Sequence, residues 1–143
     1  MKNQNDFKGV NSRIDPIQAA ILAVKLEALD PVTARRREIA ATYSAGFAKA
    51  GLDHPHVPVW HLYVIRHPQR DAFQQRLAEA GIGTVIHYPT PPHLQKAFAD
   101  EGHAPGSLPL AERLAQEVLG LPMCPAQTDE QTEYAIDRVT ALT

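Results

Sequence analysis

The sequence predicts an α+β domain in which helices cover a small sheet. Two long segments with helical hydrophobic spacing come first, between residues 16 and 50. A strand, a helix and a second strand follow between residues 60 and 87, and two further helices flank a short extended piece before the C-terminus. This order suits a small sheet with helices packed on one face.

The first helix is predicted from Pro16 to about Leu29. Asp15 is a favourable N-cap, Pro16 suits the first helical position, and Gln18 lies at capping-box spacing. The apolar residues of this helix cover more than one face, and such a helix is normally enclosed on several sides. We therefore expect the isolated monomer to expose a larger apolar patch than a soluble monomer usually does.

The remaining elements are predicted from periodicity and from turn residues. A second helix is expected from about Asp30 to Ala50, closed by Gly51, with Ile39, Tyr43, Phe47 and Ala50 on its core face. We then expect strands at 60–65 and 84–87, a helix at 71–80 ended by Gly81, a helix at 109–119, an extended piece at 121–125 and a terminal helix at 128–142. Three prolines between residues 88 and 93 argue against regular structure there.

The bulk properties exclude several classes of protein. The chain has 143 residues, of which 44% are hydrophobic and 21% charged, as in soluble globular domains. A net charge of −2 disfavours nucleic acid or an acidic membrane as the main partner. The polar first ten or so residues indicate a loose lead-in without a signal-peptide core, and no apolar stretch is long enough to span a bilayer. A cytoplasmic protein is expected.

No metal site or cysteine nucleophile is expected. His54 and His56 flank Pro55, with His61 nearby, but a structural zinc site needs cysteine partners or a spacing that the sequence lacks. A turn in a surface loop is the simpler interpretation. Cys124, the single cysteine, excludes an internal disulfide and is expected to be a small core residue.

Two segments could carry chemistry. Residues 9–15 place Asn11, Ser12 and Arg13 just before a helix N-terminus, where an anion could bind, or they form only a helix lead-in. A guanidinium such as that of Arg13 can hold a phosphate or carboxylate bidentately.

The second segment, residues 86–95, is a proline-stiffened loop. It either presents His87, Tyr88, His93 and Gln95 at a cleft or forms a connection whose polar groups satisfy one another. The residues alone leave both choices open.

Several motifs resemble, in order, those of the sugar aminotransferases usually grouped as DegT/DnrJ/EryC1/StrS. They lie at residues 9–22, 35–40, 60–64, 81–89, 92–95, 111–115 and 121–123. The resemblance implies the small C-terminal domain of a fold type I enzyme, similar to aspartate aminotransferase, with preceding long helices. In that family a large domain holds pyridoxal phosphate (PLP), and the active site lies at a dimer interface.

The resemblance also implies domains, partners and site residues. Residues 1–15 would be a polar lead-in carrying the cofactor-phosphate and substrate motif. Residues 16–143 would be the small domain with its linking helices, and the large PLP-binding domain would be absent. A homodimer or a large-domain partner is expected. Asn11 would reach the PLP phosphate of the partner subunit, and the substrate-binding residues would be Arg13, His87, Tyr88 and His93.

The departure from the family concerns the lysine that forms the Schiff base with PLP, which lies well upstream of the Gly-x-Asn-Ser-Arg motif. The lysines here are Lys2, Lys8, Lys25, Lys49 and Lys96, and none stands in that place. We therefore expect no catalytic residue in this chain and no activity from it alone.

The function implied is the transfer of an amino group from glutamate to a keto nucleotide sugar. Residues 88–95 look closest to members that aminate a 3-keto dTDP- or UDP-sugar. The alternatives are a non-catalytic binding or regulatory module and a degenerate remnant of the family.

Overall fold

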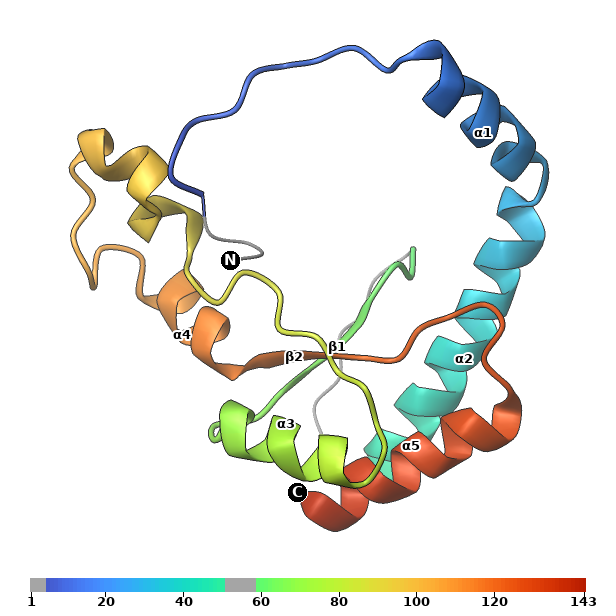
Figure 1. Cartoon of the computed structure of the whole chain (residues 1–143). Coiled ribbons are helices and arrows are strands. Elements are labelled where there is room, and N and C mark those ends of the chain that lie inside the picture. Colours follow the sequence, from blue (N-terminus) through green and yellow to red (C-terminus); the bar gives the residue numbers. More distant parts are fainter. Residues whose placement is uncertain (1–4, 51–58) are drawn as a thin grey trace.

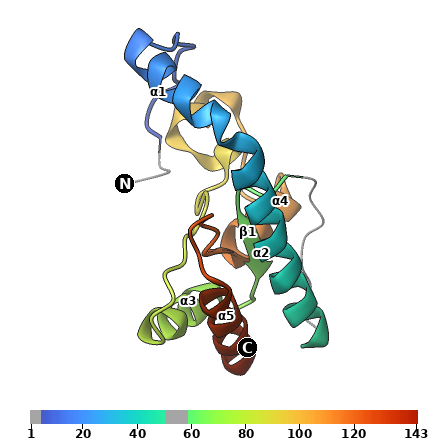
Figure 2. The same ribbon diagram turned by 90° about the vertical axis from the view of Figure 1, so that its right-hand side faces the viewer.

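A computed structural model describes residues 5–50 and 59–143, and its helices pack against a short two-stranded sheet. An extended N-terminal segment arches away from the body of the domain and leads into α1 (Pro16–Glu27) and α2 (Leu29–Lys49), which follow each other closely (Figures 1 and 2). The C-terminal half of α2 reaches the domain body, while α1 projects beyond it. The predicted α+β class is confirmed.

The sheet joins β1 (Tyr63–Arg66) to β2 (Val118–Leu121) in antiparallel register. Tyr63 pairs with Leu121 and Ile65 with Leu119, so four buried side chains share one face. Because alternate residues of a strand point to opposite faces, this register fixes which side of the sheet meets the helices. The predicted strand at 84–87 is reduced to one bridge, in which Val85 exchanges backbone hydrogen bonds with Gly120.

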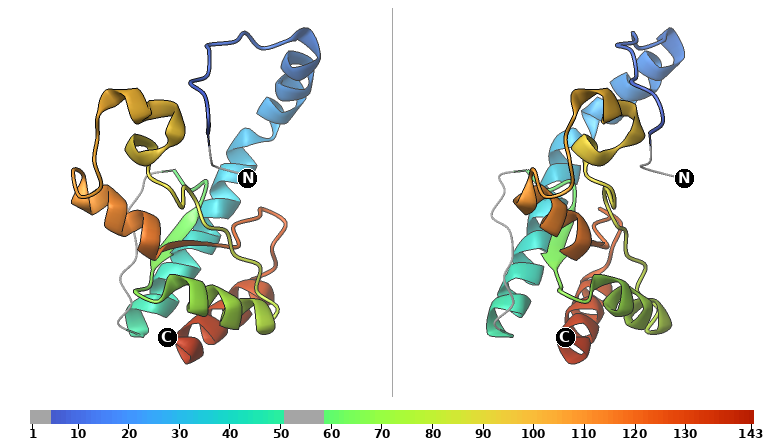
Figure 3. Two further views of the ribbon diagram at one scale, coloured as in Figure 1. Left: turned by 60° about the vertical axis from the view of Figure 1, so that its left-hand side comes forward. Right: turned by 90° about the vertical axis from the view of Figure 1, so that its left-hand side faces the viewer.

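The core lies between this face and three helices, α2, α3 (Arg70–Glu79) and α5 (Asp129–Leu142) (Figure 3). The rings of Tyr43, Phe47 and Tyr63 have centroids 4.9–5.9 Å apart, within the range of favourable aromatic pairs. Phe73 and Leu77 of α3 complete the contact with the sheet. The helix spacing read from the sequence of α2 is confirmed, except that Ala50 is exposed.

Some predicted boundaries were wrong. The helix expected at 109–119 is α4 (Pro109–Glu117), and strand β2 occupies 118–121 instead of an extended piece at 121–125. Val118 pairs with Arg66 and the Glu117 carbonyl accepts from the His67 N–H at 2.9 Å, so pairing with β1 ends the helix early. The strand expected at 60–65 likewise lies at 63–66. The irregular loop contains one short 3₁₀ turn, η1 (Pro92–Leu94), followed by η2 (Lys96–Glu101).

The predicted N-caps of α1 and α5 and the start of α4 at Pro109 are confirmed, whereas α2 and α3 each begin one residue earlier than expected. The Asp15 side chain accepts from the Gln18 N–H at 2.8 Å, and Thr128 with Gln131 forms a complete capping box at the start of α5. The expectation for Cys124 was wrong, because its side chain is exposed in the loop between β2 and α5. Met123 is buried and Pro122 and Pro125 are half-buried, so apolar neighbours in the sequence do not bury the thiol of Cys124.

The lead-in is not loose over the part that the structure describes. The Ala97 N–H donates to the Asn5 carbonyl at 3.1 Å, and the Lys8 ammonium contacts Asp100 at 3.0 Å and Glu101 at 3.2 Å. These carboxylates raise the pKa of Lys8. The segment is therefore anchored on η2 before it arches toward α1 (Figure 1).

The helix α1 buries none of its residues against the rest of the chain. Ile17 is 74% exposed and Leu22 53% exposed, and further apolar side chains follow along the helix. The expected apolar patch is therefore present on the described monomer. None of the described helices is long and apolar enough to cross a membrane.

Candidate functional site

The motif at residues 9–13 lies on the extended segment before α1. Asn11 and Arg13 are exposed, and neither makes a hydrogen bond or ion pair with any other residue that the structure describes. An amide and a guanidinium left free in this way can donate to an external phosphate or carboxylate. The segment thus offers donors without using them to hold the fold together.

The N-terminus of α1 contributes less to an anion site than its position suggested. Pro16 has no N–H, and the N–H of Gln18 is already bound by the Asp15 carboxylate. That carboxylate also repels a second anion placed at the same helix end. An anion at this place would therefore have to be held mainly by side chains such as those of Asn11 and Arg13.

His87 lies against the sheet. A Cβ added at Gly120 would be 3.1 Å from the His87 Nε2, so the glycine makes room for the imidazole ring. The Nε2 is buried and has no hydrogen-bond partner among the described residues. A buried imidazole nitrogen without a partner is unfavourable, and it is the kind of group that a ligand or another polypeptide can satisfy.

Tyr88 has an unusual backbone. Its φ is +52°, the left-handed region that side chains other than glycine rarely adopt. Such backbone strain persists where the surrounding structure imposes it, commonly beside binding sites. Together with His87, Pro91 and Leu114, Tyr88 lines a small hollow of about 150 Å³, while its own side chain is 58% exposed.

His93 is held differently. Its Nε2 lies 3.1 Å from Glu112 Oε1, and its ring stands edge-on to His103 with centroids 6.0 Å apart. Glu112 also accepts from the Gly106 and Leu108 N–H groups. These bonds and the imidazole lower the pKa of Glu112, the Gly106 N–H having the largest effect. His93 therefore has a structural partner in addition to any ligand.

Gln95 belongs to the scaffold. Its Nε2 donates to the Thr90 carbonyl at 3.0 Å and its Oε1 accepts from the Asn5 N–H at 2.7 Å. The side chain is 4% exposed, so it ties the N-terminal segment to the proline-rich loop. The interpretation that polar groups of this loop satisfy one another holds for Gln95.

The predicted residues therefore lie in three places. His87 and Tyr88 are adjacent at one hollow, and His93 lines a second hollow that shares Pro92 and Ala111 with the first. Asn11 and Arg13 lie on the extended segment, and no hydrogen bond or ion pair between described residues links them to either histidine. The described residues contain no cluster that could hold a metal ion, and His54 and His56 lie outside them.

Two contributors were missed in the sequence. Glu112 organises the loop before α4, and no local pattern marks a carboxylate that accepts from residues four and six positions earlier. Gly120 was detectable in principle, because an isolated glycine inside a strand often marks a close approach of another group.

Comparison with known proteins gives one consistent family. The model of the DegT/DnrJ/EryC1/StrS aminotransferase family matches residues 1–140. A dTDP-3-amino-3,6-dideoxy-α-D-galactopyranose transaminase of Aneurinibacillus thermoaerophilus is 46% identical over 96% of this chain and 39% of its own length. A dTDP-3-amino-3,4,6-trideoxy-α-D-glucose transaminase of Streptomyces venezuelae is 42% identical over 96% of this chain and 38% of its own length.

Solved structures agree. DesV of S. venezuelae, crystallised with a ketimine intermediate, superposes with a TM-score of 0.81 at 40% identity. The match covers 99% of this chain and 40% of that protein. The chain therefore spans about 40% of the length of the relatives it matches.

Proposed function

The chain belongs to the DegT/DnrJ/EryC1/StrS aminotransferase family, and from this premise we propose that it is the small C-terminal domain of a PLP-dependent sugar-nucleotide aminotransferase. Residues 1–15 carry the ligand-binding motif and residues 16–143 form the domain with its linking helices. The complete site would also need a large domain. The observation that carries this proposal is the match of almost the whole chain to about 40% of each relative.

The apolar surface of α1 supports the same interpretation. A helix with no buried residue and many exposed aliphatic side chains is unfavourable in water. We propose that a large domain covers this surface in the assembled enzyme, either in the same polypeptide or in a separate one. The free donors of Asn11 and Arg13 lie just before this helix, so they would face the same assembly.

Each proposed site residue has a distinct role. The Asn11 amide donates to the PLP phosphate of the partner subunit, and the Arg13 guanidinium binds a phosphate of the nucleotide sugar. The buried His87 Nε2 receives its missing partner from the sugar, and Tyr88 presents its exposed hydroxyl beside it. His93 contacts substrate from the second hollow while Glu112 holds its ring.

The residues of this chain fit one end of the cofactor. Unpaired amide and guanidinium donors suit a phosphate group, which PLP and a nucleotide sugar both carry. PLP, when bound, supplies the electron sink for moving the amino group. Among the described lysines, Lys8 and Lys96 are paired with carboxylates, while Lys25 and Lys49 lie on helices α1 and α2. We propose that the amine that holds PLP comes from the large domain and that this chain alone does not catalyse transamination.

A chimera tests the proposal. The matching C-terminal 40% of the S. venezuelae transaminase is replaced by this chain, and amino-sugar formation from glutamate and a keto dTDP-sugar is measured. We expect a folded, active chimera, with Arg13→Ala and His87→Ala each lowering kcat/KM at least about tenfold, as when a charged or buried hydrogen-bond partner is lost. The exposed Arg37→Ala and His61→Ala are the matched controls and should change little.

Three results would contradict the proposal. The first is a chimera that folds and binds PLP but aminates no keto sugar. The second is turnover by the 143-residue chain alone. The third is a stoichiometric, single-site covalent PLP label on that chain after borohydride reduction. Mass spectrometry of the reduced protein measures that label directly.

The position of amination is a finer part of the proposal. We propose a 3-keto rather than a 4-keto nucleotide sugar, because residues 88–95 resemble those of 3-aminating members. The two relatives described above are named as transaminases of 3-amino dTDP-sugars, which supports this choice. Proton NMR of the chimera's product identifies the carbon that carries the new amine.

A further inference from the structure

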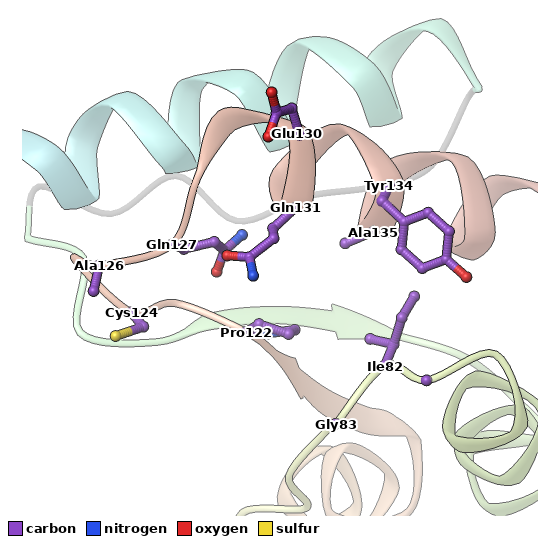
Figure 4. A pocket seen from close by; sticks show the side chains of 11 residues that line it. Ile82, Gly83, Pro122, Cys124, Ala126, Gln127, Glu130, Gln131, Tyr134 and Ala135 are labelled. Carbon is purple, nitrogen blue, oxygen red and sulfur yellow. The ribbon is translucent and has the colours of Figure 1, made fainter.

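A groove of about 490 Å³ lies on the domain body between α5, the turn after α3 and the loop after β2 (Figure 4). Its walls are mainly apolar and include Ile82, Pro122, Ala126 and Ala135. Cys124 stands at one end and Tyr134 at the other. None of the residues proposed above to bind PLP or the sugar lines this groove.

The Gln127 side chain in the groove wall is fixed by its neighbours. Its Nε2 donates to the Tyr43 hydroxyl at 3.1 Å and to the Thr132 hydroxyl at 2.9 Å. Both hydroxyls use their own protons elsewhere, Tyr43 on the Pro122 carbonyl and Thr132 on the Thr128 carbonyl. Each hydroxyl must therefore accept from Gln127, and only the NH₂ side of the amide can donate.

The protonation of Tyr43 supports this orientation. Burial raises the pKa of the Tyr43 phenol, although the hydrogen bond from Gln127 opposes the shift. The phenol therefore keeps its proton at neutral pH and continues to donate to Pro122. If the Gln127 amide were rotated by half a turn, its oxygen would face two hydroxyls whose protons are already donated elsewhere. Neither hydroxyl would then have a donor.

The consequence is an acceptor without a donor. Gln127 Oε1 is buried and has no hydrogen-bond partner among the described residues, and the residue is 7% exposed. The Oε1 of the adjacent Gln131, seen beside it in Figure 4, accepts from the Thr128 N–H, and no hydrogen bond between described residues joins Gln131 to Gln127 Oε1. A buried carbonyl in a mostly apolar groove is unfavourable until an N–H or O–H reaches it.

We propose that this groove binds a neutral and mostly apolar small molecule that donates one N–H or O–H to Gln127 Oε1. The volume lies within the usual range for small-molecule sites, and one directed polar group among apolar walls is their common composition. The exposed Glu130 carboxylate in the lining disfavours an anionic ligand. The site is separate from the proposed aminotransferase site, so either proposal can fail without the other.

Cys124 provides the measurement. It is the single cysteine of the sequence, it is exposed and it lines the groove, so its alkylation by N-ethylmaleimide reports on this place alone. Indole is the donor probe, and benzothiophene is the matched probe of similar shape without an N–H. We expect indole to slow alkylation saturably, and benzothiophene to need about a tenfold higher concentration because one hydrogen bond is missing.

A groove-filling variant gives the second arm. Gly83 lines the groove, a Cβ added there meets nothing within 4 Å, and its φ is not in the left-handed region, so we expect Gly83→Leu to fold. We expect this variant to lose protection by indole, while Ala48→Leu, an exposed change on α2, retains it. Thermal unfolding by circular dichroism checks that each variant is folded.

Two outcomes overturn the proposal. Equal potency of indole and benzothiophene would show that no donor bound in the groove reaches Gln127 Oε1 and that the groove is only apolar. Absence of any protection up to the solubility limit of indole would show that the groove is no site. If Gly83→Leu fails to fold, the comparison of the two probes on the unaltered chain decides alone.

Discussion

His93 and Glu112 form a contact of 3.1 Å, between the imidazole Nε2 and the carboxylate Oε1, that joins the proline-rich loop to α4. The same carboxylate accepts from the N–H groups of Gly106 at 2.8 Å and Leu108 at 3.2 Å. The side chains of His93 and Glu112 are 6% and 19% exposed. The Glu112 carboxylate thereby connects α4 to the proline-rich loop and to the turn at residues 106–108. These segments are not paired as strands of a sheet.

Glu112→Gln should lower the stability of the folded chain. It should also make that stability depend less on pH in the acid range. The pKa of Glu112 lies below its ordinary value of 4.5 in the folded protein, so its ionised form favours folding. That contribution is fully present above about pH 4.5 and is lost as pH falls through the depressed value. Thermal unfolding between pH 3 and 7 measures this, and the wild type should lose its advantage over the variant at the acid end.

The matched control for Glu112 is Glu133→Gln, an exposed carboxylate on α5 without a described ion pair. It should leave the midpoint of unfolding nearly unchanged at every pH. An advantage of the wild type over Glu112→Gln that persists unchanged to pH 3 would exclude ionisation of Glu112 as its cause.

Replacement of Tyr88 should separate backbone strain from side-chain loss. With φ at +52°, a β-branched residue is disfavoured there, so Tyr88→Val should cost about 1–2 kcal/mol of unfolding free energy. Tyr88→Gly relieves the strain and should be at least as stable as Tyr88→Val. Urea unfolding measures both. Tyr88→Phe is the control and should match the wild type, and equal stability of the Gly and Val variants would exclude backbone strain.

Gly46 lies where α2 packs on α5. A Cβ there would approach the Ile136 Cγ2 to 2.6 Å, which requires movement of a branched side chain. Gly46→Ala should therefore destabilise the chain by about 1–2 kcal/mol, since overpacking outweighs the gain of roughly 1 kcal/mol in helix propensity.

A double-mutant cycle checks the cause at Gly46. In an Ile136→Ala background the clash is removed, so Gly46→Ala should become neutral or stabilising in denaturant unfolding. Destabilisation of the same size in both backgrounds would show that the contact with Ile136 is not responsible.

The exposed face of α1 should make the isolated chain bind hydrophobic dyes and self-associate. Replacing Ile17 and Leu22 together by Gln should reduce dye fluorescence and association, with stability changed by no more than about 0.5 kcal/mol because both side chains are exposed. Analytical ultracentrifugation and dye titration measure these effects. The paired change Asp137→Gln with Arg138→Gln, on exposed positions of α5, should leave dye binding unaltered.

Local signals were sufficient for much of the fold. Some predictions needed only a few neighbouring residues, and these are confirmed. They are the caps Asp15 and Thr128, the start of α4 at Pro109 and the core-facing spacing of Ile39, Tyr43 and Phe47. The candidate site was reached mainly through motif resemblance, because side chains such as Arg13 and Tyr88 are exposed and have no periodicity.

By itself the sequence determined the helices, the α+β class and the family, since propensity, capping and ordered motifs are properties of short segments. Only the tertiary structure decided that β2 begins at Val118, that Cys124 faces outward, and that His87 Nε2 and Gln127 Oε1 have no partner among the described residues. These features depend on groups from distant parts of the chain, such as Tyr43 and Gln127, which form a hydrogen bond in the folded protein. Whether a polar atom has a hydrogen-bond partner can therefore be judged only from the tertiary structure.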